Sequence, residues 1–479
     1  MPAQALRCRV CETQYELEGV GVCRSCFGPL DPVYDRGRQR SEVSHASIAA
    51  GPCSLWRYAA LLPVLAPAHQ ALAPGYTPLL PAPRLAGALG LGELWLKLDT
   101  ANPTHSFKDR GVAVAAVKAA ELGLTTLSCS STGNLANAVA ARAAADGTRA
   151  VVFCPAGLEL EKLIATSVFG ATLYAVEGSY DDVSRLTVEL SFELDWGFVN
   201  AQLRAYYAEG SKTIAFEIAE QLGWSSPTAV FAPIGSGALY SKLYQGFNEL
   251  HALGLSSGEL PRLYGAQAEG CAPVADAFAS GRPVSPVVPA TAALSIAIGN
   301  PADGALAVAT ARDSGGAIYK VPEREIATNI AELAVATGVW GETAPAVTYG
   351  ALKQAVDRGE LGEADRVVLL ISGDGLKTPG LVSPLVEPIT ISADADAFLA
   401  ANAARVSRRR RLPAAAGSRD SPDRARPDDE TAASAVHLPV DDDAPMVVES
   451  GAETTSRGLR RNGMAGPTPG PVGGTARHP

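Results

Sequence analysis

The chain has few charged and few aromatic residues, and it has no long uninterrupted apolar segment. Asp, Glu, Lys and Arg make up 19% of its 479 residues, Phe, Trp and Tyr make up 6%, and the formal net charge is −10. This deficit of positive charge argues against nucleic acid as the main partner, because binding a polyanion requires clustered Lys and Arg. The most apolar stretch, residues 59–69, is interrupted by two prolines, so we expect no membrane span.

The first residues also lack the features of a secretory signal peptide. Met1–Arg7 contains no apolar segment of the required length before the first cysteine, Cys8. We therefore expect a cytoplasmic protein, in which cysteines stay reduced and serve as metal ligands or as buried thiols.

Four of the eight cysteines are clustered in two pairs, Cys8-x-x-Cys11 and Cys23-x-x-Cys26, which eleven residues separate. Two pairs at this spacing can supply four thiolates to one tetrahedral ion. Zinc is favoured, although the spacing alone also allows iron. Four protein ligands leave no open position on the ion, so the predicted site is structural and not catalytic.

Composition divides the chain into four regions. Residues 1–35 hold the cysteine pairs and are expected to form a zinc-ribbon-like segment. Residues 36–76 form a connector with a predicted short helix at 55–62, and residues 77–400 alternate apolar runs of strand length with Ala-rich helical runs. Residues 401–479 contain no Phe, Trp or Tyr and carry runs of charge, which predicts a disordered tail.

Strand-like runs separated by helical stretches predict an α/β fold with parallel sheet. In such folds, ligands bind at the loops that leave the carboxyl ends of the strands, so we expect the chemistry there. The predicted strands are Glu93–Asp99, Thr125–Ser130, Arg149–Pro155, Ala171–Val176, Ala229–Ile234, Arg262–Glu269 and Arg366–Ser372.

The most informative loop is residues 103–111, Pro-Thr-His-Ser-Phe-Lys-Asp-Arg-Gly, which places Lys108 where a loop becomes a helix. The positive field at a helix N-terminus disfavours the ammonium form of lysine. A neutral amine is the form that attacks an aldehyde to make a Schiff base. Asp109 and Arg110 are expected to form a structural pair at the helix start. Taken alone, such a lysine is more often an ordinary surface residue.

Three further loops change that interpretation. Residues 130–134, Ser-Ser-Thr-Gly-Asn, suit an anion such as an amino-acid carboxylate, and Asn134 can donate to a phenolate-type oxygen. Residues 233–238, Pro-Ile-Gly-Ser-Gly-Ala, can cradle a phosphate with backbone N–H groups. Ser372 presents a hydroxyl after the last predicted strand. Each loop alone is a common turn, but together with Lys108 they match the needs of pyridoxal phosphate.

These motifs resemble the threonine synthases, a family of fold type II pyridoxal-phosphate enzymes. The resemblance extends over about 57–378, and the sequences Gly-Asn-Pro at 299–301 and Gly-x-Gly-Leu-Lys at 373–377 favour this family over the serine/threonine dehydratases. It implies a fold like the β subunit of tryptophan synthase. Two α/β domains would hold the cofactor between them, with the smaller domain, about 110–205, inserted in the larger one.

The resemblance also implies roles for individual residues. Lys108 would bind the cofactor covalently and act as the catalytic base. Asn134 would contact the cofactor's ring oxygen and Ser372 its ring nitrogen. The residues that would hold its phosphate are Gly235, Ser236, Gly237 and Ala238. The residues that would hold the substrate carboxylate are Ser131, Thr132 and Gly133.

The implied reaction converts O-phosphohomoserine and water to L-threonine and phosphate. The substrate would be a small phosphorylated amino acid, and the fold class often forms homodimers. Two positions depart from the family pattern: Leu135 stands where many members have Thr, and residues 235–238 lack the Asn-containing phosphate loop. Arg204 and Lys212 are expected to supply the missing contacts to the substrate phosphate.

These departures leave two alternatives open. One is a related enzyme, either a cysteate-synthase-like β-replacement enzyme acting on O-phosphoserine or a serine/threonine dehydratase. The other is a non-catalytic cofactor-binding protein whose cysteine segment contacts a partner. The presence of Lys108 argues against the second alternative.

Overall fold

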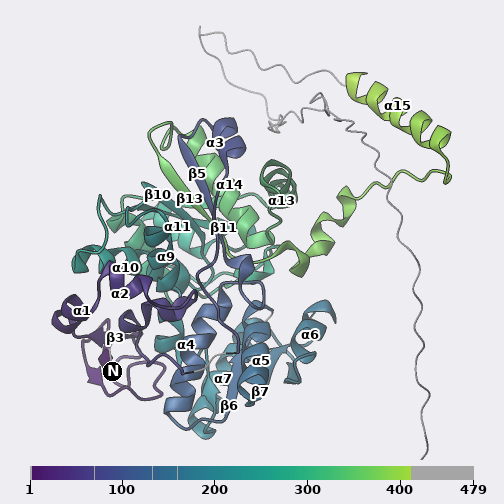
Figure 1. Cartoon of the computed structure of the whole chain (residues 1–479). Coiled ribbons are helices and arrows are strands. Elements are labelled where there is room, and N and C mark those ends of the chain that lie inside the picture. The colour runs from purple at the N-terminus through teal and green to yellow at the C-terminus, as the bar shows by residue number, and fades with distance from the viewer. Residues whose placement is uncertain (1–2, 69–70, 132, 159, 412–479) are drawn as a thin grey trace, which may run out of the picture. The chain divides into compact units, whose positions relative to one another are not determined.

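Two largely parallel sheets organise the computed structural model, which describes residues 3–68, 71–131, 133–158 and 160–411 (Figure 1). The larger sheet has the strand order β12-β11-β10-β13-β5-β4 and is parallel except for the edge strand β4. The smaller sheet has the order β8-β7-β6-β9 and is parallel throughout. The smaller sheet lies in sequence between β5 and β10 of the larger one.

All seven predicted strands are present, each within one residue of its expected bounds. The strands of the larger sheet are β4 (Leu79–Pro81), β5 (Glu93–Leu98), β10 (Ala229–Pro233), β11 (Arg262–Ala268), β12 (Ile318–Val321) and β13 (Arg366–Ile371). Those of the smaller sheet are β6 (Thr126–Ser130), β7 (Arg149–Pro155), β8 (Thr172–Val176) and β9 (Gly197–Phe198). The sequence did not predict β4, β9 and β12, because these strands have two to four residues and lie at sheet edges.

Helices occupy the connections between the strands, as parallel pairing requires. They are α3 (Pro83–Leu89), α4 (Lys108–Glu121), α5 (Asn134–Asp146), α6 (Leu160–Ser167), α7 (Tyr180–Glu193), α8 (Arg204–Glu209), α9 (Lys212–Gln221), α10 (Ala238–Leu253), α11 (Pro273–Ser280), α12 (Gly304–Asp313), α13 (Glu323–Thr337) and α14 (Thr343–Asp357). Helix α14 packs along β10 to β13, and α10 packs on α9 and β10.

Small residues allow α4 to approach its neighbours closely. Val112, Ala113, Val114 and Ala115 are almost fully buried in the core that α4 shares with α5 and α8. A Cβ at Gly111 would lie 2.6 Å from the ring of Tyr207 on α8. The first turn of α4, which carries Lys108, is therefore held against α8 by direct backbone packing.

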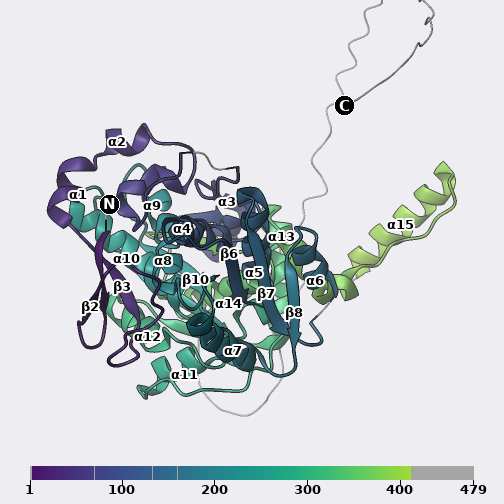
Figure 2. The same cartoon turned by 90° about the horizontal axis from the view of Figure 1, so that it is seen from below.

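The N-terminal residues form a separate antiparallel sheet of β1 (Ala3–Cys8), β2 (Gln14–Tyr15) and β3 (Leu30–Tyr34). Both views place this sheet beside α10 (Figures 1 and 2), and β3 also contacts α8. The connector that follows contains α1 (Arg36–Glu42) and α2 (His45–Ala49). The short helix predicted at 55–62 is a 3₁₀ helix over Leu55–Leu61.

The last described helix, α15, spans Ala395–Arg411. The boundary expected at residue 401 therefore falls inside a helix, because the Ala-rich sequence around it favours helix strongly. The remainder of the predicted tail, residues 412–479, lies outside the described residues. Within the described ranges, no helix is both long enough and apolar enough to cross a membrane.

Candidate active site

The loop residues predicted to bind one ligand line the same pocket. Lys108 follows β5, Asn134 follows β6, residues 235–238 follow β10, and Ser372 follows β13. Four segments that are far apart in the sequence thus meet at the carboxyl ends of parallel strands.

Lys108 is the first residue of α4, and the loop before it is fastened to the end of β13. The backbone N–H of Phe107 donates to the carbonyl of Ser372 at 3.0 Å, and that of Asp374 donates to the carbonyl of His105 at 3.1 Å. The Nζ atom of Lys108 lies 4.6 Å from the ring centre of Phe107 and 5.8 Å from that of Tyr207. No hydrogen bond or ion pair with another described residue holds this amine, so it is available to a ligand.

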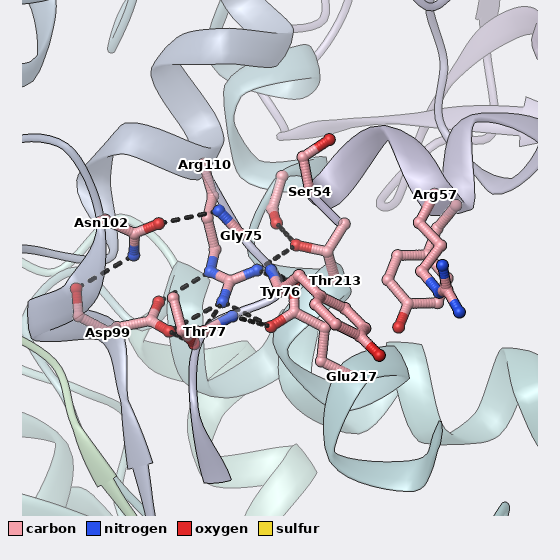
Figure 3. A network of polar contacts seen from close by, with 12 residues as sticks. Ser54, Arg57, Gly75, Tyr76, Thr77, Asp99, Asn102, Arg110, Thr213 and Glu217 are labelled. Carbon is pink, nitrogen blue, oxygen red and sulfur yellow. Dashed lines mark hydrogen bonds and ion pairs between the residues drawn. The ribbon is translucent and has the colours of Figure 1, made fainter. Parts of the chain in front are cut away.

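A buried ion-pair network anchors α4 two residues after Lys108 (Figure 3). The guanidinium of Arg110 donates to Asp99 at 2.7 and 2.8 Å and also to Glu217 on α9. Lys97 donates to the same Glu217 carboxylate at 2.6 Å. All four side chains are buried, and the network ties β5, α4 and α9 together.

The expected pairing of Asp109 with Arg110 is wrong. Asp109 instead accepts hydrogen bonds from the backbone N–H and the hydroxyl of Thr104, each at 2.9 Å. Consecutive residues on a helix point in different directions, so their side chains do not face each other. Burial raises the pKa of Asp109 to about 6 in spite of the hydrogen bonds from Thr104.

Sequence reasoning missed Glu342, which also lines the pocket. Its carboxylate accepts a hydrogen bond of 2.8 Å from the side-chain amide of Asn134. Burial raises the pKa of Glu342, and the nearby charges of Lys377 and Lys108 oppose that shift. A Cβ at position 373 would lie 2.1 Å from the carboxylate, so Gly373 makes room for it. No local pattern could have linked Glu342 to Asn134, because 208 residues separate them.

The predicted phosphate loop ends at the N-terminus of α10. Gly237 caps this helix with φ +94°, a conformation that favours glycine. The free N–H groups of the first helical turn suit an anion. A Cβ at Gly237 would also lie 2.6 Å from the carbonyl oxygen of Asp303, so no larger residue fits. The buried hydroxyl of Ser295 lines the same pocket and has no hydrogen-bond partner within the described structure.

The four clustered cysteines lie together at one end of the N-terminal sheet. Their sulfur atoms are all within 4.8 Å of one another. The Sγ atoms of Cys8 and Cys26 are 3.4 Å apart, as are those of Cys11 and Cys23. Four thiols at these separations are compatible with one tetrahedral metal ion.

Comparison with known proteins identifies the family. Residues 71–373 match the family described as pyridoxal-phosphate dependent enzymes. The chain is 36% identical over 398 residues to the threonine synthase of Methanosarcina acetivorans, and the match covers 82% of this chain and 97% of that protein. The chain belongs to the threonine synthase family of pyridoxal-phosphate enzymes.

A second relative supports the family, and solved structures share the fold. The threonine synthase of Methanocaldococcus jannaschii is 34% identical over 393 residues, which cover 81% of this chain and 96% of that protein. Diaminopropionate ammonia lyase from Escherichia coli shares the fold with a TM-score of 0.56 at 20% identity, over 64% of this chain and 87% of that one. Maize serine racemase shares the fold with a TM-score of 0.53 at 18% identity, over 64% of this chain and 92% of that one. The α/β fold of type II pyridoxal-phosphate enzymes expected from the sequence is thereby confirmed.

The pocket fits the family's cofactor. It offers a helix N-terminus for the phosphate and the amine of Lys108 for the aldehyde. Neither this amine nor the hydroxyl of Ser295 has a hydrogen-bond partner among the residues that the structure describes. A buried hydroxyl without a partner is the kind of group that a bound polar ligand satisfies. The roles assigned above to Lys108, Asn134, residues 235–238 and Ser372 stay predictions, which this placement supports.

The residues predicted to hold the substrate carboxylate are only partly placed. The hydroxyl of Ser131 accepts hydrogen bonds of 3.1 Å from the N–H groups of Gly133 and Ala136, so it is bonded to the first turn of α5. Thr132 lies outside the described residues. Leu135 packs in the hydrophobic core and does not line the pocket, so it leaves the pocket chemistry unchanged.

Neither residue proposed for the substrate phosphate lines the pocket, and the expectation is corrected for both. Lys212 is fully buried, and its ammonium lies 2.5 Å from Glu209 and 3.0 Å from Glu249. Arg204 forms an ion pair with Asp303. Their position near a family motif suggested a role in binding, but both side chains pair with carboxylates that do not line the pocket.

Proposed function

We propose that the protein converts O-phosphohomoserine and water to L-threonine and phosphate. The observation that carries this proposal is the amine of Lys108. No described residue pairs with it, and it lies in a pocket with a helix N-terminus for a phosphate. The chain covers 97% of a threonine synthase. When bound, pyridoxal phosphate supplies an aldehyde for the substrate amine and a ring that accepts electrons as protons leave carbon.

Lys108 moves the protons in this proposal. Its Nζ atom takes a proton from Cα of the substrate and then one from Cβ, and the bond from Cγ to the phosphate oxygen breaks. Water adds at Cβ, and protons return to Cγ and Cα. One amine can serve these neighbouring carbons in turn, because the substrate is held in one place.

The other pocket residues orient and select. Asn134, which donates to Glu342, would contact the cofactor's ring oxygen. The N–H groups of 235–238, at the start of α10, would hold its phosphate. Ser372 would face the ring nitrogen with a neutral hydroxyl, which could not keep that nitrogen protonated and so would disfavour transamination. Phe107 and Tyr207 flank the amine of Lys108 with apolar surface.

The four cysteines, in this proposal, hold a structural zinc ion. The short distances between the four sulfur atoms support metal binding. A site with four thiolate ligands has no open position for a substrate, which supports a structural role. Elemental analysis of purified protein is expected to give one zinc per chain. The quadruple replacement of Cys8, Cys11, Cys23 and Cys26 by serine is expected to remove it.

Phosphate release from purified, cofactor-loaded protein tests the catalytic proposal. O-phosphohomoserine is expected to give phosphate and threonine in equal amounts, while Lys108→Ala gives neither. Release from O-phosphoserine but not from O-phosphohomoserine would overturn the substrate assignment and favour the β-replacement alternative. Absence of release from either compound would overturn the catalytic proposal.

A further inference from the structure

Arg9 connects the cysteine segment to the catalytic region. It lies between Cys8 and Cys11, and its backbone N–H donates to the carbonyl of Pro29 at 3.0 Å, which fixes it within this segment. Its guanidinium leaves the segment and bonds two carboxylates. Nε and Nη2 donate to Asp31 at 2.5 and 2.7 Å, and Nη1 donates to Asp303 at 2.9 Å.

Asp303 lies directly behind the predicted phosphate loop. Its backbone N–H donates to the carbonyl of Ser236 at 2.8 Å. Its own carbonyl packs so tightly against Gly237 that a Cβ there would come within 2.6 Å. The side chain of Asp303 is only 3% exposed, and it receives both Arg9 and Arg204. Asp303 therefore joins the two arginines, through its carboxylate, to the loop, through its backbone.

Asp31 provides a second connection. Its carboxylate accepts a hydrogen bond of 2.8 Å from Lys242. Lys242 is buried on α10, the helix that begins at Ala238 immediately after the loop. Arg9 is thus linked through Asp303 to the loop and through Asp31 to the helix whose N-terminus faces the pocket.

We propose that Arg9 and Asp303 are positioning residues for the loop that binds the cofactor phosphate, and that the cysteine segment sets the affinity for the cofactor through them. The proposal rests on the proposed function only in taking residues 235–238 as the phosphate site. Arg9 is suited to this task, because a planar guanidinium can bond two carboxylates at once with fixed geometry. Neither residue is among those that line the pocket, so both would act through the loop.

The test compares Arg9→Ala with the matched variant Arg7→Ala in the full-length protein. Arg7 lies two residues earlier on β1, is exposed, and makes no ion pair with a described residue. For each protein, the dissociation constant of pyridoxal phosphate is measured by fluorescence titration. The ³¹P resonance of the bound cofactor reports the phosphate environment independently of turnover.

Arg9→Ala is expected to bind the cofactor about tenfold more weakly, a usual size for coupling between two sites, and to shift the ³¹P resonance. Arg7→Ala is expected to match the wild type in both. Unchanged affinity and an unchanged resonance in a folded Arg9→Ala protein would overturn the proposal. If the wild type binds the cofactor and Arg9→Ala binds it equally well, only this inference is refuted. If the wild type itself binds no cofactor, the proposed function is refuted as well.

A second variant covers the case in which Arg9→Ala does not fold. Asp303→Asn keeps the size of the side chain and the backbone hydrogen bond to Ser236, but it removes the charge that both arginines bind. It is expected to weaken cofactor binding in the same direction and to shift the ³¹P resonance. A folded Asp303→Asn protein with wild-type values would overturn the proposal.

Discussion

Glu217→Gln is expected to destabilise the protein by about 3 kcal/mol at pH 7. Burial raises the pKa of Glu217, but the charges of Arg110 and Lys97 outweigh it and leave the pKa at about 2, against an ordinary value of 4.5. That difference corresponds to roughly 3 kcal/mol, since one pKa unit is worth 1.36 kcal/mol. Removal of one partner from a buried ion pair costs about 3–5 kcal/mol, which is the same size.

The lower end of that range is expected because burial of the Lys97 ammonium itself costs free energy. Burial lowers the pKa of Lys97 by more than its attraction to Glu217 raises it. Part of the attraction within the network therefore offsets the desolvation of this lysine and does not appear as net stability.

The pH dependence gives a second test of the same reasoning. A carboxylate whose pKa is lowered by folding contributes stability above its unfolded pKa, and that contribution is lost as the pH falls through the folded pKa. The difference between wild type and Glu217→Gln should therefore be full above pH 4.5 and shrink between pH 4.5 and about 2.

Urea denaturation at a series of pH values measures this difference. The matched control is Glu193→Gln, which makes the same chemical change at an exposed position on α7 where no described residue pairs with it. The control is expected to change the free energy of unfolding by less than about 0.5 kcal/mol. A loss below about 1 kcal/mol for Glu217→Gln, with no dependence on pH, would refute the account of the network.

Three further predictions concern the site and the tail. Lys108→Ala is expected to lower turnover by more than about 10³-fold. After borohydride reduction, mass spectrometry should find no cofactor attached to this variant. Attachment at another lysine would contradict the assignment of Lys108. Gly237→Ala is expected to weaken cofactor binding at least about tenfold, because the new Cβ would meet Asp303. The control Gly87→Ala, whose Cβ would meet nothing within 4 Å, should bind the cofactor as the wild type does. Equal affinities of the two variants in a titration would contradict the assignment of residues 235–238 to the cofactor phosphate. Truncation after residue 411 is expected to leave kcat unchanged, and a severalfold loss in steady-state assays would assign the tail a catalytic role.

The sequence predicted the strands because their composition follows directly from burial. Strands such as β10 and β13 are covered on both faces, so almost every residue is apolar and the run is visible without knowledge of its neighbours. The loops at their ends were predictable for the same reason. Ser372 follows the apolar run of β13 directly, and Lys108 stands at the start of the helix that comes after β5.

Contacts between distant segments could not be predicted. Glu342 meets Asn134 across 208 residues, and Arg110 bonds Glu217 across 107. Local patterns favoured the neighbours Asp109 and Arg110, although their side chains diverge on the helix. Lys212 shows the same limit, because its position near a family motif says nothing of the carboxylates that α10 brings to it.

Incubation with O-phosphohomoserine in ¹⁸O-labelled water tests the central claim most directly. The proposed reaction breaks the bond between Cγ and oxygen and adds water at Cβ, so mass spectrometry should find the label in the hydroxyl of threonine and none in phosphate. Label in phosphate, with homoserine as the other product, would show simple hydrolysis at phosphorus and contradict the account.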